Sequence, residues 1–269
     1  MKESGIGSKK IIRRKHDGEL EYLPDELTIE EPLEIRVGGR AIATTMRTPG
    51  HDEELAAGFL LSEGIVRAPN QIASVSACGE NRVAVELGEG VKLKLDSTKR
   101  FGTISSSCGL CGKTSIGAIR QNFAAIRSGD IRIEIERVLS FPKLLRNAQS
   151  DFARTGGIHA AGVFSMDGEL KIAREDIGRH NAVDKVVGRA LLDGLLPLAK
   201  HLLLVSGRAS FEIVQKALAA GIPILAAVSA PSSLAVEFAR DSNQTLIGFL
   251  RPPSFNVYTH VERVIFNSA

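Results

Sequence analysis

The 269-residue sequence predicts an α/β protein, α+β overall, in which a strand-rich first half precedes a second half of alternating strands and helices. From about residue 201 onward, short apolar strands alternate with helices, an order typical of a buried parallel sheet. In the first half, strand-like stretches surround a single stretch with helical spacing. Hydrophobic residues make up 43% of the chain, so a sizeable core can be buried.

The first half begins with a charged segment, residues 1–18, for which we expect a disordered basic tail. A hairpin is expected over 33–46, because Gly38 and Gly39 suit a two-residue turn. Residues 52–62 have helical spacing and carry acids in the first turn, where the helix dipole favours them. Three further strands are expected, at 72–78, 82–87 and 91–95. Residues 19–100 therefore predict a small, β-rich α+β unit.

Residues 101–137 are expected to hold a cysteine loop and a connecting helix, with helical spacing near 116–126 and a charged junction at 128–137. Residues 138–269 then predict an α/β domain. It is expected to open with strands at 158–164 and 169–173 and a helix at 181–192. The alternating part is expected to contain strands at 201–205, 224–228 and 245–250, and helices at 210–220 and 233–240.

Composition restricts the class of protein. The formal net charge is +3 and the sequence pI about 8.8, which suits an anionic ligand or an acidic partner but is too weak to indicate nucleic acid. No apolar run approaches the roughly 20 residues of a membrane helix, and the charged N-terminus lacks the apolar stretch of a secretory signal. Three cysteines are too few for a disulfide framework. We therefore expect a cytoplasmic protein that binds neither nucleic acid nor membrane.

The pair Cys108 and Cys111 lies in a loop rich in serine and glycine, Ser105-Ser106-Ser107-Cys108-Gly109-Leu110-Cys111-Gly112-Lys113. The glycines leave the sulfurs accessible, which favours a reactive role. A zinc site needs about four ligands, and Cys78 is the one cysteine left, so no metal is expected. Three alternatives stay open: a zinc deaminase that uses His51 and Glu53, a thioredoxin-like dithiol, and two ordinary loop cysteines.

Two loops, 206–210 and 229–233, each follow a strand and precede a helix. Backbone N–H groups at helix N-termini attract phosphate, and ligands of open α/β sheets bind at the carboxyl ends of strands. Arg208 would add charge. The alternative is simple helix capping by Ser210 and by Ser232 or Ser233. His159 could equally be a core histidine, and Asp176, Arg179 and His180 could equally form a buried salt-bridge network.

Several segments resemble the formate dehydrogenase accessory sulfurtransferases, the FdhD family. The similarity spans residues 30–265 and is carried by SSSCGLCGK, TTMRTPGHDEELAAGFLLSEGI, TGGIHAAGVF, REDIGRHNAVDKVVG, SGRASFEIVQKA, SAPSSLAVEFAR and TLIGFLR. It implies a cytidine-deaminase-like, three-layer α/β/α domain that has lost the deaminase zinc, beside the smaller N-terminal unit. It also implies a sulfurtransferase that takes sulfur from a cysteine desulfurase and gives it to the molybdenum cofactor, as formate dehydrogenase requires.

By this resemblance Cys108 carries the persulfide, and Cys111 resolves, relays or assists. The substrate is Mo-bis(molybdopterin guanine dinucleotide), which GDP would mimic in part. Contacts to it are expected from Phe249, Leu250, Arg251, Pro252, Pro253 and Ser254, and for its guanine nucleotide end from Ser206, Gly207, Arg208, Ser229 and Ser232. We also expect a homodimer. Two rival functions are a cofactor-binding chaperone without sulfur transfer and a zinc-dependent nucleotide deaminase.

Overall fold

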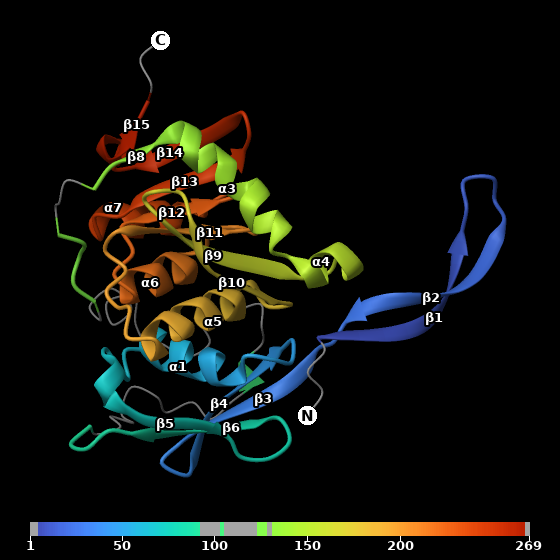
Figure 1. The fold of residues 1–269 in the computed structure, drawn as a ribbon, viewed down its shortest axis with the longest axis horizontal. Helices are drawn as coiled ribbons and strands as arrows, with labels where there is room; N and C mark the ends of the chain where they lie inside the picture. Colours follow the sequence, from blue (N-terminus) through green and yellow to red (C-terminus); the bar gives the residue numbers. More distant parts are fainter. Residues whose placement is uncertain (1–4, 92–102, 105–122, 128–130, 267–269) are drawn as a thin grey trace.

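A computed structural model of the protein describes residues 5–91, 103–104, 123–127 and 131–266 (Figure 1). Cys108, Cys111 and most of the strand expected at 91–95 lie outside these residues. Within the described residues, no helix combines the length and apolar character needed to cross a bilayer.

The larger sheet has six strands in the order β10-β9-β11-β12-β13-β14. Its three central strands β11, β12 and β13 are parallel, and the outer strands are antiparallel to their neighbours. The strands are β9 (His159–Ser165), β10 (Leu170–Asp176), β11 (His201–Val205), β12 (Ile224–Ala227), β13 (Thr245–Arg251) and β14 (Ser254–Thr259).

Helices cover both faces of this sheet, which confirms the expected three-layer α/β/α arrangement (Figure 1). On one face lie α5 (Arg179–Leu192), α6 (Phe211–Ala219) and α7 (Ser233–Asp241). On the other lies α3 (Ile135–Asn147), whose Phe141 ring stacks on Phe164 at 4.2 Å between centroids. Successive residues of β11 alternate between the two cores, since Leu203 faces the α5 side and Leu202 and Leu204 face α3.

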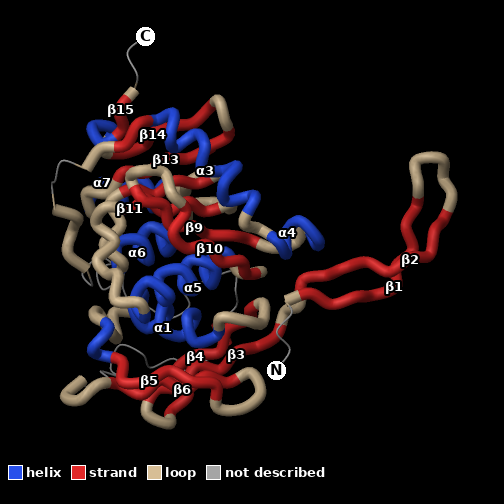
Figure 2. Tube along the Cα trace, viewed as in Figure 1, coloured by secondary structure: helices blue, strands red, loops and turns tan. Residues whose placement is uncertain are grey.

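The second sheet has five strands in the order β5-β6-β3-β4-β7. Helix α1 (Asp52–Ser62) lies between this sheet and α5 (Figure 2). The strands are β3 (Glu31–Val37), β4 (Arg40–Arg47), β5 (Ile72–Ala77), β6 (Arg82–Leu87) and β7 (Thr103–Ile104). The expected hairpin is confirmed, and Gly38 and Gly39 both have positive φ in its turn.

Two glycines let α1 and α5 approach closely. A Cβ on Gly188 of α5 would lie 1.8 Å from the carbonyl oxygen of Glu54, and one on Gly58 of α1 would lie 1.9 Å from that of Asp184. One continuous core of buried apolar residues follows from this contact. It includes residues of both sheets, such as Ile35 of β3 and Leu203 of β11.

The expected disordered tail is wrong for most of its residues. Ile6–Arg14 forms β1, which pairs antiparallel with β2 (Leu20–Thr28), and the ribbon projects away from the body (Figure 1). Cross-strand charge pairs, such as Lys9 opposite Asp25, explain why a charged segment forms a strand. At its base, the guanidinium of Arg154 in α4 (Ser150–Thr155) bonds the Glu26 carboxylate.

Other expectations are corrected in part. Phe123–Arg127 is not helical, so the helix expected near 116–126 does not include its last residues, and 116–122 lies outside the described part. Val91 is not in a strand. The structure adds α3, α4 and β14, and a short parallel pair of β8 (Ile133–Glu134) with β15 (Val264–Ile265). The remaining strands and helices of the second half agree with expectation to within about two residues at most ends.

Candidate functional site

The candidate site lies at the edge of the six-stranded sheet where its parallel strands end. Ser206 follows β11, and Val228 and Ser229 follow β12. Because β9 runs antiparallel to β11, the first residue of β9, His159, reaches the same edge. Strand β10 ends there too, since Asp176 pairs with His159. Helices α5 and α6 therefore begin at this edge, which the sheet topology alone dictates.

Hydrogen bonds join the loops of this edge to one another. The Ser206 hydroxyl accepts from the backbone N–H of Ala160 at 2.9 Å, and the Ser229 N–H donates to the carbonyl of Gly207 at 3.3 Å. Further along, the Phe249 N–H donates to the Ser229 carbonyl at 3.1 Å, and Arg251 Nε donates to the Val228 carbonyl at 3.0 Å. The three expected cofactor segments thus form one connected surface.

A cleft of about 580 Å³ opens on the α3 side of this edge. Its floor includes His159, Ser206 and Val228, and its far wall comes from the end of α3 and from α4. In that wall the guanidinium of Arg146 lies 3.7 Å from the ring centroid of Phe152. The cleft has the size of ordinary small-molecule sites. It combines a cation, an aromatic ring and backbone groups, which suits a nucleotide.

Basic groups gather beside the cleft. A Cβ placed on Gly207 would lie 3.3 Å from His159 Nδ1 and 3.7 Å from Arg179 Cδ. Both side chains therefore lie next to the loop 206–210, the first of the two loops expected to bind phosphate. Arg208 is exposed in the same loop. Burial lowers the pKa of His159, and the charge of Arg179 lowers it further, so the neutral form of this imidazole is favoured. A neutral imidazole can accept a proton as an anion binds.

The nearby histidine His180 is occupied by a carboxylate. Its Nε2 lies 2.9 Å from Glu212 Oε2 and 3.0 Å from Ser210 Oγ, and the imidazole is nearly buried. Ser210 therefore contacts His180 and does not cap α6 with its side chain, whereas Ser232 does cap α7 by accepting from the Ala235 N–H at 3.2 Å. The capping alternative is confirmed for one of the two helices.

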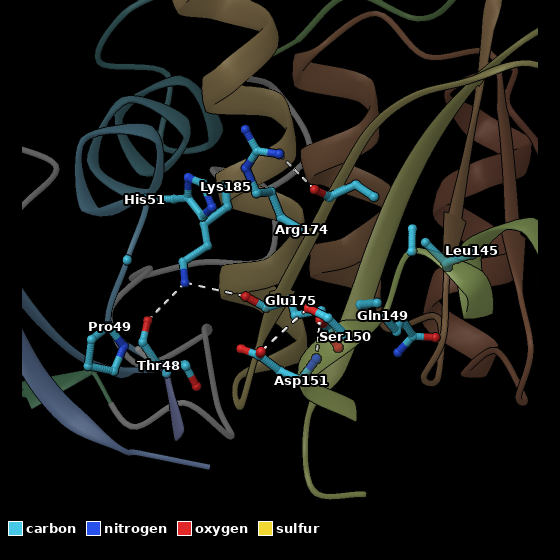
Figure 3. A pocket seen from close by; sticks show the side chains of 15 residues that line it. Thr48, Pro49, His51, Leu145, Gln149, Ser150, Asp151, Arg174, Glu175 and Lys185 are labelled. Atoms are coloured by element: carbon cyan, nitrogen blue, oxygen red, sulfur yellow. Dashed lines mark hydrogen bonds between the residues drawn. The ribbon is translucent and has the colours of Figure 1, made fainter. Parts of the chain in front are cut away.

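A buried ion pair fixes the opposite end of the edge. Lys185 Nζ lies 2.7 Å from Asp176 Oδ2. It also donates to the Thr48 carbonyl at 2.9 Å, beside a second cavity of about 300 Å³ (Figure 3). Asp176 also accepts from the Thr48 N–H, at 3.1 Å. The segment after β4 is thereby tied to β10 and α5. Asp176 thus takes part in a buried salt bridge, as the alternative for this residue expected, but its partner is Lys185, and His180 pairs with Glu212.

Near this cavity Glu54 of α1 meets Arg174 of β10, whose Nε lies 2.6 Å from Glu54 Oε2. Burial by itself raises the pKa of Glu54, but hydrogen bonds from Arg174 and His51 outweigh burial and lower this pKa to about 2, from an ordinary 4.5. A carboxylate with a lowered pKa stabilises the folded state above its unfolded pKa, and this contribution is lost as pH falls through the folded pKa.

We therefore expect Glu54→Gln to lower the free energy of unfolding at pH 7 by about 3 kcal/mol, the equivalent of the pKa difference. The deficit should shrink as pH falls from about 4.5 toward 2, where the wild-type carboxylate is protonated as well. Urea unfolding across this pH range measures it. Glu53→Gln, an exposed neighbour in the same turn, is the control. Equal deficits at neutral and acid pH would contradict the ion-pair explanation.

Known proteins resemble this chain over nearly its full length. A sequence model of the FdhD/NarQ family matches residues 28–265. The chain belongs to the FdhD/NarQ family. It is 50% identical to a protein of Streptomyces avermitilis named sulfur carrier protein FdhD, over 97% of this chain and 96% of that one. A protein of the same name from Mycobacterium tuberculosis is 51% identical, over 90% of this chain and 92% of the relative.

A solved structure agrees with this FdhD/NarQ membership. The crystal structure of a protein from Desulfotalea psychrophila, described as a formate dehydrogenase accessory protein, superposes with a TM-score of 0.79 at 26% identity. The match covers 97% of this chain and all of that one. The expected family is confirmed.

The structure brings most of the expected site residues of this FdhD/NarQ member to one edge. Leu250 differs, because its side chain is fully buried in the core on the α3 side and only its backbone could touch a ligand. Phe249 is 37% exposed, and its ring centroid lies 5.9 Å from the guanidinium of Arg251. Cys108 and Cys111 lie outside the described residues.

Residues on the far wall of the cleft were not expected from the sequence. Arg146, Gln149 and Phe152 line it, and no strand end or glycine motif marks them. Their one sequence signal is the proximity of Arg146 and Phe152 to the Thr155-Gly156-Gly157 segment. Within the described part of the chain, no three His, Cys, Asp or Glu side chains gather as metal ligands do.

Proposed function

We propose that the chain is a sulfur carrier that holds a persulfide on Cys108 and transfers its outer sulfur to Mo-bis(molybdopterin guanine dinucleotide), the substrate. The sulfur comes from a cysteine desulfurase, and the sulfurated cofactor serves formate dehydrogenase, with the protein acting in the cytoplasm as a homodimer. Family membership and the names of the relatives support the sulfur-carrier role. The basic edge of the sheet supports a phosphate-bearing substrate.

In the first step the Cys108 thiolate attacks the outer sulfur of the desulfurase persulfide. A new S–S bond forms to Cys108, the old S–S bond breaks, and the desulfurase cysteine leaves as a thiolate, so sulfur, proton and charge balance. Cys111 resolves or assists. This chain's loops at 206–208, 229–232 and 249–254 bind and orient the guanine nucleotide end of the substrate.

The observation that carries the proposal is the position of β7. Ile104 pairs with Thr45 of β4, and the Thr45 hydroxyl donates to Asn181 Oδ1 at 3.3 Å, close to the start of α5 at the basic edge. Cys108 follows Ile104 by four residues, and four residues span at most about 14 Å. Ile104, the last described residue before Cys108, therefore lies near the proposed cofactor site, which supports sulfur transfer there.

Mass spectrometry of the protein after incubation with a desulfurase and cysteine tests the carrier function. We expect one added sulfur atom that maps to Cys108 and is removed by a thiol reductant, with Cys108→Ser as the control. An unmodified protein that still supports formate dehydrogenase maturation would favour the chaperone alternative. Metal analysis of the purified protein tests the deaminase alternative, for which about one zinc per chain is required.

Arg208→Ala should weaken GDP binding by about 1–3 kcal/mol, because it removes a charge-assisted hydrogen bond to phosphate. Isothermal titration calorimetry measures the change. Arg40→Ala, which removes an exposed arginine at the start of β4, should leave the affinity unchanged. If the two variants bind GDP equally, Arg208 is not part of the nucleotide site.

A further inference from the structure

The ribbon formed by β1 and β2, here called the arm (residues 6–28), has two unlike faces. The pairing register places Ile12 opposite Tyr22 and Arg14 opposite Leu20 on one face. The next pair, Arg13 opposite Glu21, lies on the other face, as does Lys9 opposite Asp25. One face therefore carries Ile12, Leu20 and Tyr22 toward the tip, and the other alternates charge pairs with the apolar pair Ile11 opposite Leu23.

The apolar face is open to solvent. Ile12 is 58% exposed, Leu20 57% and Tyr22 77%, so three large side chains lie bare on one surface. The described contacts between the arm and the body lie at its base, where Thr28 Oγ1 donates to Thr155 Oγ1 at 3.0 Å and Arg154 bonds Glu26. In Figure 1 the rest of the arm extends clear of the body.

A two-stranded ribbon without a covered face is marginally stable in water at best. An arm with nine residues in each strand thus needs a partner that is present for most of the protein's lifetime. A desulfurase visits only during sulfur delivery, which would leave the face bare between encounters. A second copy of the chain would cover it permanently.

Charge and area agree with a second copy. The arm carries five Lys or Arg and five Asp or Glu, so it neither repels an identical arm nor selects an acidic or basic partner. Nine residues at about 3.3 Å each and two strands about 4.8 Å apart give each face roughly 300 Å². Two arms and the two surfaces that receive them bury roughly 1,200 Å², the lower end of stable interfaces.

We propose that the arm is a dimerisation element whose apolar face, Ile12, Leu20 and Tyr22, lies on a second copy of this chain in a reciprocal, two-fold exchange. This inference rests on the proposed homodimer and is independent of the sulfur-transfer steps. The arm, which lies outside both cavities, would then hold the two copies together.

Sedimentation velocity over a concentration series tests the arm with the full chain. Ile12→Thr with Tyr22→Thr removes the apolar face but keeps a β-branched residue in each strand. Two apolar side chains are lost at each of two arms, so the dimer dissociation constant should rise by about 100-fold or more. The control is Arg13→Thr with Glu21→Thr, the adjacent pair on the opposite face, for which we expect a change within about threefold.

Three outcomes overturn the inference in distinguishable ways. A wild-type protein that stays monomeric throughout removes the homodimer as well as the arm contact. A wild-type dimer that the Ile12 and Tyr22 changes leave intact means that another surface holds the copies together. An intact dimer that loses only persulfide uptake from the desulfurase means that the arm docks the desulfurase. If the monomeric variant still takes up persulfide sulfur, then sulfur transfer does not depend on dimerisation.

Discussion

The variant Cys108→Ala, Cys111→Ala is expected to abolish activation of formate dehydrogenase while it keeps wild-type affinity for GDP. The loops at 206–208 and 229–232 are held by hydrogen bonds within the edge of the six-stranded sheet. Each of these bonds joins two described residues outside the cysteine segment, so binding should survive the loss of both thiols. Activation requires a thiolate that accepts sulfur and should not survive it.

Activation of a formate dehydrogenase in cells that lack the wild-type protein, together with GDP calorimetry on the purified variant, separates the three functions. A chaperone without sulfur transfer predicts that activation persists, because sheltering a cofactor needs no thiol. A zinc deaminase predicts that binding and activation fall together, because removing ligands disrupts the pocket. If GDP affinity falls with activation and no zinc is present, the cysteine segment is itself part of the nucleotide site.

Gly188→Ala is expected to destabilise the protein by about 3 kcal/mol or more, although alanine is ordinarily the better helix former by about 1 kcal/mol. The new methyl group would lie 1.8 Å from the Glu54 carbonyl oxygen and 2.6 Å from the Gly58 nitrogen. Both atoms belong to the backbone of α1, so no side chain can move aside. Helix α1 would have to shift away from α5, against the sheet on which it packs.

Urea unfolding followed by circular dichroism measures this effect. Gly7→Ala in β1 is the control, because its added methyl would meet only the side chain of Ile29, at 3.4 Å, an ordinary contact distance. We expect the control to change the unfolding free energy by less than about 1 kcal/mol. An unchanged midpoint for Gly188→Ala would show that the two helices are not in the close contact described here.

The second half of the fold could be predicted because its local and tertiary signals agree. Short apolar strands such as Leu202–Val205 alternate between two cores, which leaves a run without polar positions. The arm could not be predicted, because β1 pairs with β2 through opposite charges that the charged pattern of β1 alone does not reveal. Helix α3 shows the spacing Val138, Phe141, Leu145 that marks a buried face, but Pro142 within it hides the signal.

Some residues of the candidate site could likewise be predicted from the sequence, and others could not. Residues after parallel strands, such as Ser206 and Ser229, could be assigned to one edge because parallel strands end together. His159 lies at this edge because β9 runs antiparallel to β11, and the direction of β9 could not be predicted from the sequence. Arg146 and Phe152 reach the cleft only through the path of α3 and α4 across the sheet. Contacts between distant segments of this kind have no local sequence signal.

The close contact of α1 with α5 also governs how the molecule can be divided. Apolar side chains of both sheets share one interior, and the ion pair of Arg174 with Glu54 crosses the same boundary. If either the N-terminal or the C-terminal half were expressed alone, the apolar side chains that it contributes to this shared interior would be exposed to water. A chain cut once between Ile104 and Phe123 should therefore stay together as two non-covalently associated fragments and melt in one transition. We therefore expect the protein to unfold as a single cooperative unit, so that deletion of either half leaves the other unfolded.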